Sequence, residues 1–101
     1  METNVSTQQS QVRIQLSGRF DFNSHREFRE AVDRALGTPD TTEVAVDLGK
    51  VAYLDSSALG MLLMLRDKAK GVGKAVSLVN ATGSVRQVLD IANFGKLFPI
   101  V

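Results

Sequence analysis

The chain has 101 residues, which is enough for one folded domain with a modest core and leaves no room for a second. Hydrophobic residues make up 44% and charged residues 23% of the sequence, the proportions of a folded globular protein and not of a disordered one. The formal net charge of +1 creates no strong field that would attract nucleic acid or an anionic membrane.

The N-terminal part of the chain predicts a lead-in and a first strand. Residues 1–11 are polar and lack the basic start and apolar run of a signal peptide, so we interpret them as a flexible or strand-forming lead-in. In residues 12–16, apolar and polar side chains alternate with a period of two. This alternation predicts a strand with one face on a core and the other in water.

A helix and a second strand are expected next. Asn23 or Ser24 can cap the helix, and Gly37 and Pro39 end it. Its apolar residues recur at helical spacing and are Phe28, Ala31, Val32, Ala35 and Leu36. Alternating apolar residues at 44–48 then predict the second strand.

Residues 56–70 predict a second helix with Asp55 or Ser56 at its cap. This helix is apolar on nearly every side along its first half, so it must be largely covered by the rest of the protein. Its longest apolar stretch, residues 58–65, is far shorter than the roughly 20 residues that a membrane span requires. We therefore expect no membrane insertion.

The last part of the chain predicts a buried strand and a third helix. Residues 71–73 break the second helix, and the Val-rich run at 75–79 is typical of a buried strand. The third helix is expected to begin near Thr82 or Ser84 and to stop around residues 93–95. An apolar tail follows, made of Leu97, Phe98, Ile100 and Val101.

Strands that alternate with helices favour an α/β layered domain with right-handed crossovers. The expected fold is a single domain over residues 1–101, with a mixed β-sheet of four to five strands covered by three to four α-helices.

Few residues of the chain offer catalytic or metal-binding chemistry. Without cysteine there are no disulfides, thiolate metal sites or cysteine nucleophiles, which fits a cytoplasmic location. His25 is the only histidine and is expected to lie in solvent, because a metal or catalytic role needs partners. Asp21, Asp47 and Asp55 follow or end predicted strands, so a small enzyme or a magnesium-dependent sensor is one hypothesis. No phosphate-binding glycine loop or hydrolase serine motif accompanies them, and we expect no cofactor and no metal.

The segment Asp55-Ser56-Ser57-Ala58-Leu59-Gly60 places two hydroxyls at the start of an otherwise apolar helix. On spacing alone, these residues can simply cap the helix. The segment nevertheless resembles the central signature of STAS domains, in particular the anti-sigma factor antagonists, and it follows a Val-Asp-Leu strand as in that family. The resemblance covers nearly the whole chain. Residues 18–21 are similar to the Gly-x-Leu-Asp turn of the family, with Phe20 in place of leucine.

The resemblance implies a protein-binding switch and not an enzyme. In the family, the serine after the motif aspartate is phosphorylated, which implies Ser56 as the acceptor here, with Ser57 as the nearby competitor. The implied partners are an anti-sigma factor, a serine protein kinase and a serine phosphatase, with the domain a monomer or a weak dimer. The expected partner-binding residues are Asp21, Asn23, Tyr53, Asp55, Ser56, Ser57 and Met61, although Met61 and Met64 can equally be core residues. A constitutive accessory subunit of a transport complex is the alternative function.

Overall fold

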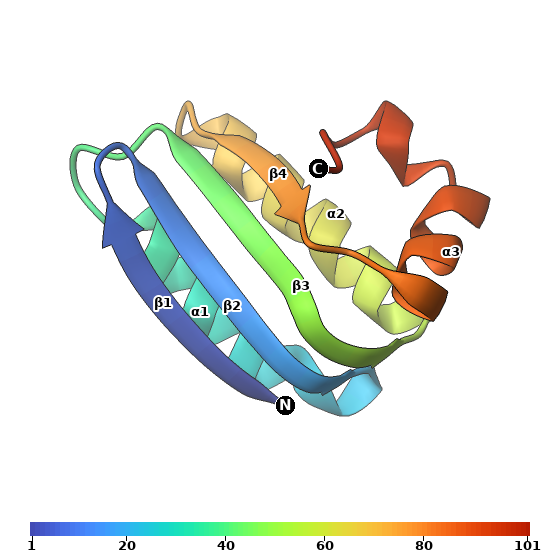
Figure 1. The fold of residues 1–101 in the computed structure, drawn as a ribbon. Helices are drawn as coiled ribbons and strands as arrows, with labels where there is room; N and C mark the ends of the chain where they lie inside the picture. Colours follow the sequence, from blue (N-terminus) through green and yellow to red (C-terminus); the bar gives the residue numbers. More distant parts are fainter.

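The computed structural model describes residues 1–101 and shows one mixed sheet in the order β1-β2-β3-β4 (Figure 1). In chain order the elements are β1 (Glu2–Gln8), β2 (Gln11–Phe20), η1 (Phe22–Ser24), α1 (His25–Leu36), β3 (Glu43–Leu54), α2 (Ser56–Gly71), β4 (Ala75–Val79), α3 (Gly83–Ile91) and η2 (Phe94–Lys96). β1 is antiparallel to β2, whereas β2, β3 and β4 are parallel to one another. The predicted α/β fold with a mixed sheet is confirmed.

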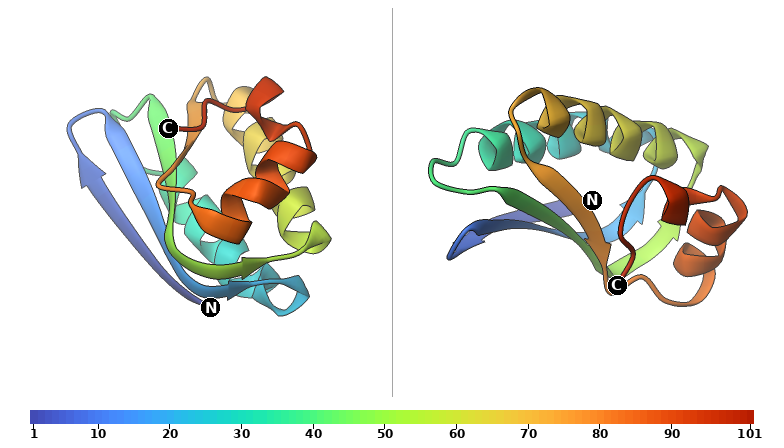
Figure 2. Two further views of the ribbon diagram at one scale, coloured as in Figure 1. Left: turned by 45° about the vertical axis from the view of Figure 1, so that its right-hand side comes forward. Right: turned by 90° about the horizontal axis from the view of Figure 1, so that it is seen from above.

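Most of the hydrophobic core lies between the sheet and the helices α1 and α2, and α3 adds Val85 and Leu89 to it. Val12, Ile14 and Leu16 of β2 are fully buried, as their alternation predicts. α1 and α2 cover the same face of the sheet (Figure 2). The rings of Phe20 and Phe28 lie 4.9 Å apart and join the end of β2 to α1. Each large apolar side chain buried in this layer contributes on the order of 1.5–3 kcal/mol.

Two strands extend beyond their predicted residues, and the first is β2, which continues to Phe20 and is not limited to residues 12–16. The polar lead-in forms β1, which agrees with the strand-forming interpretation. β3 continues to Leu54 and is not limited to residues 44–48. Its second half loses the period of two, because the pairing of β2 with β3 shifts register around Ser17 and Gly18, and Gly18 has φ +94°. Because of this irregularity, the alternation of apolar and polar residues does not predict that the strand continues beyond residue 48.

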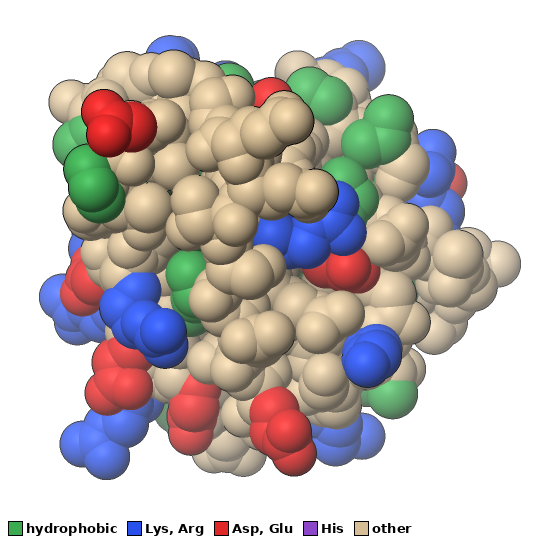
Figure 3. Space-filling view, turned by 60° about the vertical axis from the view of Figure 1, so that its left-hand side comes forward, with side chains coloured by type: hydrophobic (Ala, Val, Ile, Leu, Met, Phe, Trp, Pro, Cys, Tyr) green, Lys and Arg blue, Asp and Glu red, His purple; other side chains and the backbone are tan.

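The face of the sheet opposite α1 and α2 carries mainly polar side chains. Arg13 forms an ion pair of 3.1 Å with Asp47 on this face. Figure 3 shows the side of the molecule that includes the β1 edge, where basic and acidic side chains alternate and hydrophobic ones form only small separate patches. No helix of the structure is long and apolar enough to span a membrane.

The C-terminal segment completes the outer edge of the sheet. Leu78 and Ile100 form a parallel bridge, so residues 99–101 lie beside the second half of β4. Phe98 is buried, and its ring stacks on Phe94 with a centroid distance of 5.4 Å. The predicted apolar tail therefore belongs to the folded domain.

Candidate protein-interaction site

The site forms where two neighbouring parallel strands end. Phe20 pairs with Leu54 at the last position of the β2–β3 ladder. The carboxyl ends of parallel strands meet at one edge of a sheet, so the loops after β2 and β3 emerge side by side. This pairing brings the turn after Phe20 next to Asp55, which accepts a hydrogen bond from the Phe22 N–H.

The loop after β2 is held by a reciprocal capping arrangement centred on Asp21. The Asp21 carboxylate accepts a hydrogen bond from the Asn23 N–H at 3.0 Å, and the Asp21 N–H donates to Ser24 Oγ at 3.1 Å. Ser24 Oγ in turn donates to the Arg19 carbonyl at 3.0 Å. Ser24 is the N-cap residue of α1, one of the two expected from the sequence, but its side chain makes no capping hydrogen bond to α1. Asp21 performs the capping because a short 3₁₀ turn, η1, precedes α1.

Asp55 joins the two loops and caps α2. Its Oδ1 accepts from the Ala58 N–H at 2.9 Å, and its Oδ2 accepts from the Phe22 N–H at 3.2 Å. Its own N–H donates to the Phe20 carbonyl at 3.3 Å. Of the two caps that the sequence allowed, the structure has Asp55. One carboxylate thus fixes the start of α2 and the position of η1 relative to it.

The two serines of the motif differ in exposure. Ser56 is exposed at the first position of α2, and Ser57 is half-buried. The first N–H groups of a helix have no partner within the helix, and the helix dipole places partial positive charge there. The Ser56 hydroxyl therefore lies in solvent, at a helix end that favours an anion.

Two exposed aromatic side chains lie on the segments that adjoin the start of α2. Tyr53 is 42% exposed, and the Arg19 guanidinium lies 4.3 Å from the centre of its ring, in cation–π contact. Phe22 is 69% exposed, and its ring meets that of His25 edge-on. Neither Phe22 nor Arg19 is among the individual partner-binding residues expected from the sequence. Strand alternation would place Phe20 and Phe22 on the same face, whereas β2 ends at Phe20 and Phe22 lies in η1, exposed to solvent.

Met61 does not belong to the exposed surface. It is 2% exposed and belongs to the core, so of the two roles expected for Met61 the structure has the core role. Met64 is half-buried. The exposed stripe of α2 consists instead of Ser56, Gly60, Leu63 and Asp67. Residues at this spacing share one side of a helix. The stripe continues the surface around Ser56 along α2.

The three candidate acids do not form one site. Asp47 accepts hydrogen bonds from Gly49 N–H and the Asn80 amide and pairs with Arg13, in the middle of β3 and away from Asp55. Burial alone would raise the pKa of Asp47, but these donors and the Arg13 charge outweigh it and lower the pKa. No three His, Asp or Glu side chains lie close enough to hold a metal ion. Asp47 is therefore a structural ion-pair residue.

Comparison with protein families identifies one match. The chain matches the family described as "Mlab, STAS domain" over residues 3–100. A STAS-domain containing protein of Pseudomonas aeruginosa (strain UCBPP-PA14) is 52% identical over 87 residues, which cover 86% of this chain and 84% of the relative.

Solved structures share the fold at low sequence identity. An anti-sigma factor antagonist from Mycobacterium paratuberculosis superimposes with a TM-score of 0.85 at 19% identity, covering 98% of this chain and 83% of its own. The phosphorylated form of the Bacillus cell fate determinant SpoIIAA gives 0.72 at 19% identity, covering 99% and 91%. A sulfate transporter family protein from Wolinella succinogenes gives 0.74 at 13% identity, covering 91% and 74%.

Proposed function

Because the chain belongs to the STAS domain family, we propose that it is an anti-sigma factor antagonist whose binding is switched by phosphorylation of Ser56. The unmodified domain binds an anti-sigma factor or a related regulator, and the phosphorylated domain releases it. The observation that carries this proposal is the exposed Ser56 hydroxyl at the start of α2, directly after the capping Asp55. The domain acts by binding and not by catalysis, in the cytoplasm.

Ser56 is a better phosphate acceptor than Ser57 on physical grounds. A kinase must enclose the target hydroxyl, and Ser56 is exposed whereas Ser57 is half-buried. A phosphoserine carries about 1.5 to 2 negative charges and three acceptor oxygens at neutral pH. The free N–H groups and positive dipole end of α2 favour such a group at Ser56.

The same modification is unfavourable in a partner complex. The exposed surface that we propose for the partner includes Phe22 of η1, Tyr53 near the end of β3 and Leu63 of α2, which suit an apolar interface. A partner packed on this surface would bury the phosphate without supplying a compensating charge. Phosphorylation therefore releases the partner while the domain stays folded. A serine kinase and a serine phosphatase complete the cycle.

The test is to map phosphate on the protein isolated from its own cells and to measure binding to the anti-sigma factors encoded in the same genome. We expect a phosphatase-sensitive mass increase on the peptide that contains Ser56, and binding by the unmodified protein alone. Ser57→Ala is the matched control and should be phosphorylated normally. Phosphate on Ser57 alone, or equal binding by both forms, would contradict the proposal.

A constitutive subunit of a transport assembly is the second candidate. It is favoured by the occurrence of the same fold in a sulfate transporter family protein. This function predicts stable co-purification with membrane-complex subunits, and Ser56→Asp and Ser56→Ala should leave that association unchanged. An association lost with Ser56→Asp would favour the switch.

A further inference from the structure

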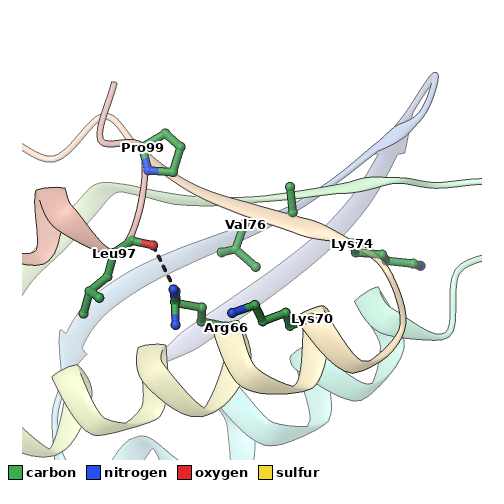
Figure 4. A pocket seen from close by; sticks show the side chains of 7 residues that line it. Arg66, Lys70, Lys74, Val76, Leu97 and Pro99 are labelled. Atoms are coloured by element: carbon green, nitrogen blue, oxygen red, sulfur yellow. Dashed lines mark hydrogen bonds between the residues drawn. The ribbon is translucent and has the colours of Figure 1, made fainter.

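A small cavity lies between α2 and β4, at the opposite end of α2 from Ser56. It has a volume of about 230 Å³ and is lined by Arg66 and Lys70 of α2 and by Val76 of β4, with Leu97 and Pro99 at one end (Figure 4). At 1.5 Å per residue, Arg66 lies about 15 Å along the helix from Ser56. The cavity is therefore separate from the proposed switch surface.

Two cationic groups converge in this cavity without an acidic residue in its lining. Figure 4 shows the Lys70 side chain extending toward Arg66, whose guanidinium turns to the Leu97 carbonyl, whereas Lys74 points away. Arg66 Nε donates to the Leu97 carbonyl at 3.0 Å, and the nearest carboxylate, on exposed Asp67, lies 4.0 Å from Arg66 Nη1. Like charges at this spacing on a helix repel each other. An anion placed between them would remove the repulsion.

The backbone of β4 is open beside the same cavity. In a parallel ladder, alternate residues direct their N–H and C=O groups to the same neighbouring strand. The Leu78 N–H donates to the Pro99 carbonyl and the Leu78 C=O accepts from the Val101 N–H, both at 2.9 Å, so Leu78 faces the C-terminal segment. Val76, two residues earlier, faces the same side. The C-terminal segment makes no backbone hydrogen bond with it.

We infer that this edge binds an extended acidic segment of a partner protein. The segment pairs with the free N–H and C=O of Val76 and places a carboxylate between Arg66 and Lys70. Its apolar neighbours contact Leu97 and Pro99. A peptide fits better than a free phosphate ion, because a peptide backbone offers an N–H for the Val76 carbonyl and a C=O for the Val76 N–H at the spacing of a strand. The cavity is also smaller than the roughly 300–1,000 Å³ of typical small-molecule sites, and strand addition to a free edge is a common mode of peptide recognition.

The test uses amide NMR of the ¹⁵N-labelled domain with two capped pentapeptides. One alternates valine with glutamate (Ac-Val-Glu-Val-Glu-Val-NH2) and the other alternates valine with lysine. We expect saturable shifts at Val76 and Leu97 with the glutamate peptide and none with the lysine peptide. The Val76 amide should also become better protected from hydrogen exchange when the peptide is bound. Ser56→Asp should bind the peptide equally well, so this test is independent of the proposed switch.

Lys70→Gln should weaken the affinity of the domain for the glutamate peptide by about three- to fivefold, the range for a partly screened ion pair. Lys68→Gln is the matched control, since Lys68 lies on the same helix but pairs with Asp33 at 3.8 Å, and should change nothing. Equal shifts with the lysine peptide, no shift at Val76, or the same shifts with inorganic phosphate alone would each overturn the inference. The last result would identify the cavity as a simple anion site.

Discussion

At the residue scale, the adjacent residues Asp55 and Ser56 have different roles. Asp55 holds the structure of the site, and Ser56 is the proposed phosphate acceptor. The Asp55 carboxylate is fully used inside the protein, because one oxygen caps α2 and the other holds the Phe22 N–H. Ser56 follows directly, and its side chain is exposed. A kinase can therefore modify the serine without breaking the hydrogen bonds that position it.

Asp55→Ala should lower the free energy of unfolding by about 1–2 kcal/mol, because it removes the helix cap and the link to η1. Asp55→Asn should cost less, since asparagine is also a good cap. Urea unfolding of the three proteins measures the difference. If Asp55→Ala proves as stable as the native protein, the two hydrogen bonds contribute little.

Asp47 gives the fold a dependence on acid. Its folded-state pKa lies below the ordinary value of 3.8, so the folded protein holds the proton less tightly than the unfolded chain. The ionised group stabilises the fold above that value, and this stability is lost as the pH falls through the folded-state pKa. Asp47→Asn should cost about 1–3 kcal/mol at neutral pH. It should also flatten the acid limb of a plot of melting temperature against pH. An unchanged acid limb would assign the acid sensitivity to other carboxylates.

At the scale of the element, Gly60 interrupts the exposed stripe of α2. A Cβ added at this position would meet nothing within 4 Å, so the packing of the domain does not require glycine here. Glycine in the middle of a helix is about 0.5–1 kcal/mol less favourable than alanine. The position between Ser56 and Leu63 is the closest point to which a partner can approach the helix backbone.

Gly60→Ala should raise the free energy of unfolding by about 0.5–1 kcal/mol. Gly60→Gln should fold normally but weaken binding of the anti-sigma partner at least about tenfold, because its side chain occupies the interface. Chemical unfolding and titration calorimetry on both variants separate the two effects. Full binding by Gly60→Gln would place the interface elsewhere on the domain.

At the scale of the whole molecule, the proposed switch changes a surface and not the fold. Ser56→Asp adds charge at the favourable end of α2, so the melting temperature should stay within about 2 °C of the native value. Partner binding should be lost, and Ser56→Ala should bind constitutively. Thermal unfolding and a pull-down with the purified partner provide the two measurements. A large drop in melting temperature would mean that the variant acts through unfolding.

The sequence by itself determined the class of fold and the order of its elements. Strong local signals were responsible: the period of two in residues 12–16, the Val-rich run that became β4, and the helical spacing in α1. The motif at residues 55–60 also indicated the position of the candidate phosphate acceptor and its family. Such signals depend on neighbours along the chain, which a sequence displays directly.

Only the tertiary structure decided which side chains face solvent and which loops meet. Met61 is in the core and Leu63 on the surface because α2 packs against the sheet and α1 along a direction that its nearly uniform apolarity does not reveal. Asp55 reaches Phe22, and Arg66 and Lys70 come to lie beside the open edge of β4, through contacts between distant segments. These contacts depend on strand register and on the direction of helix packing, which no local pattern in the sequence encodes.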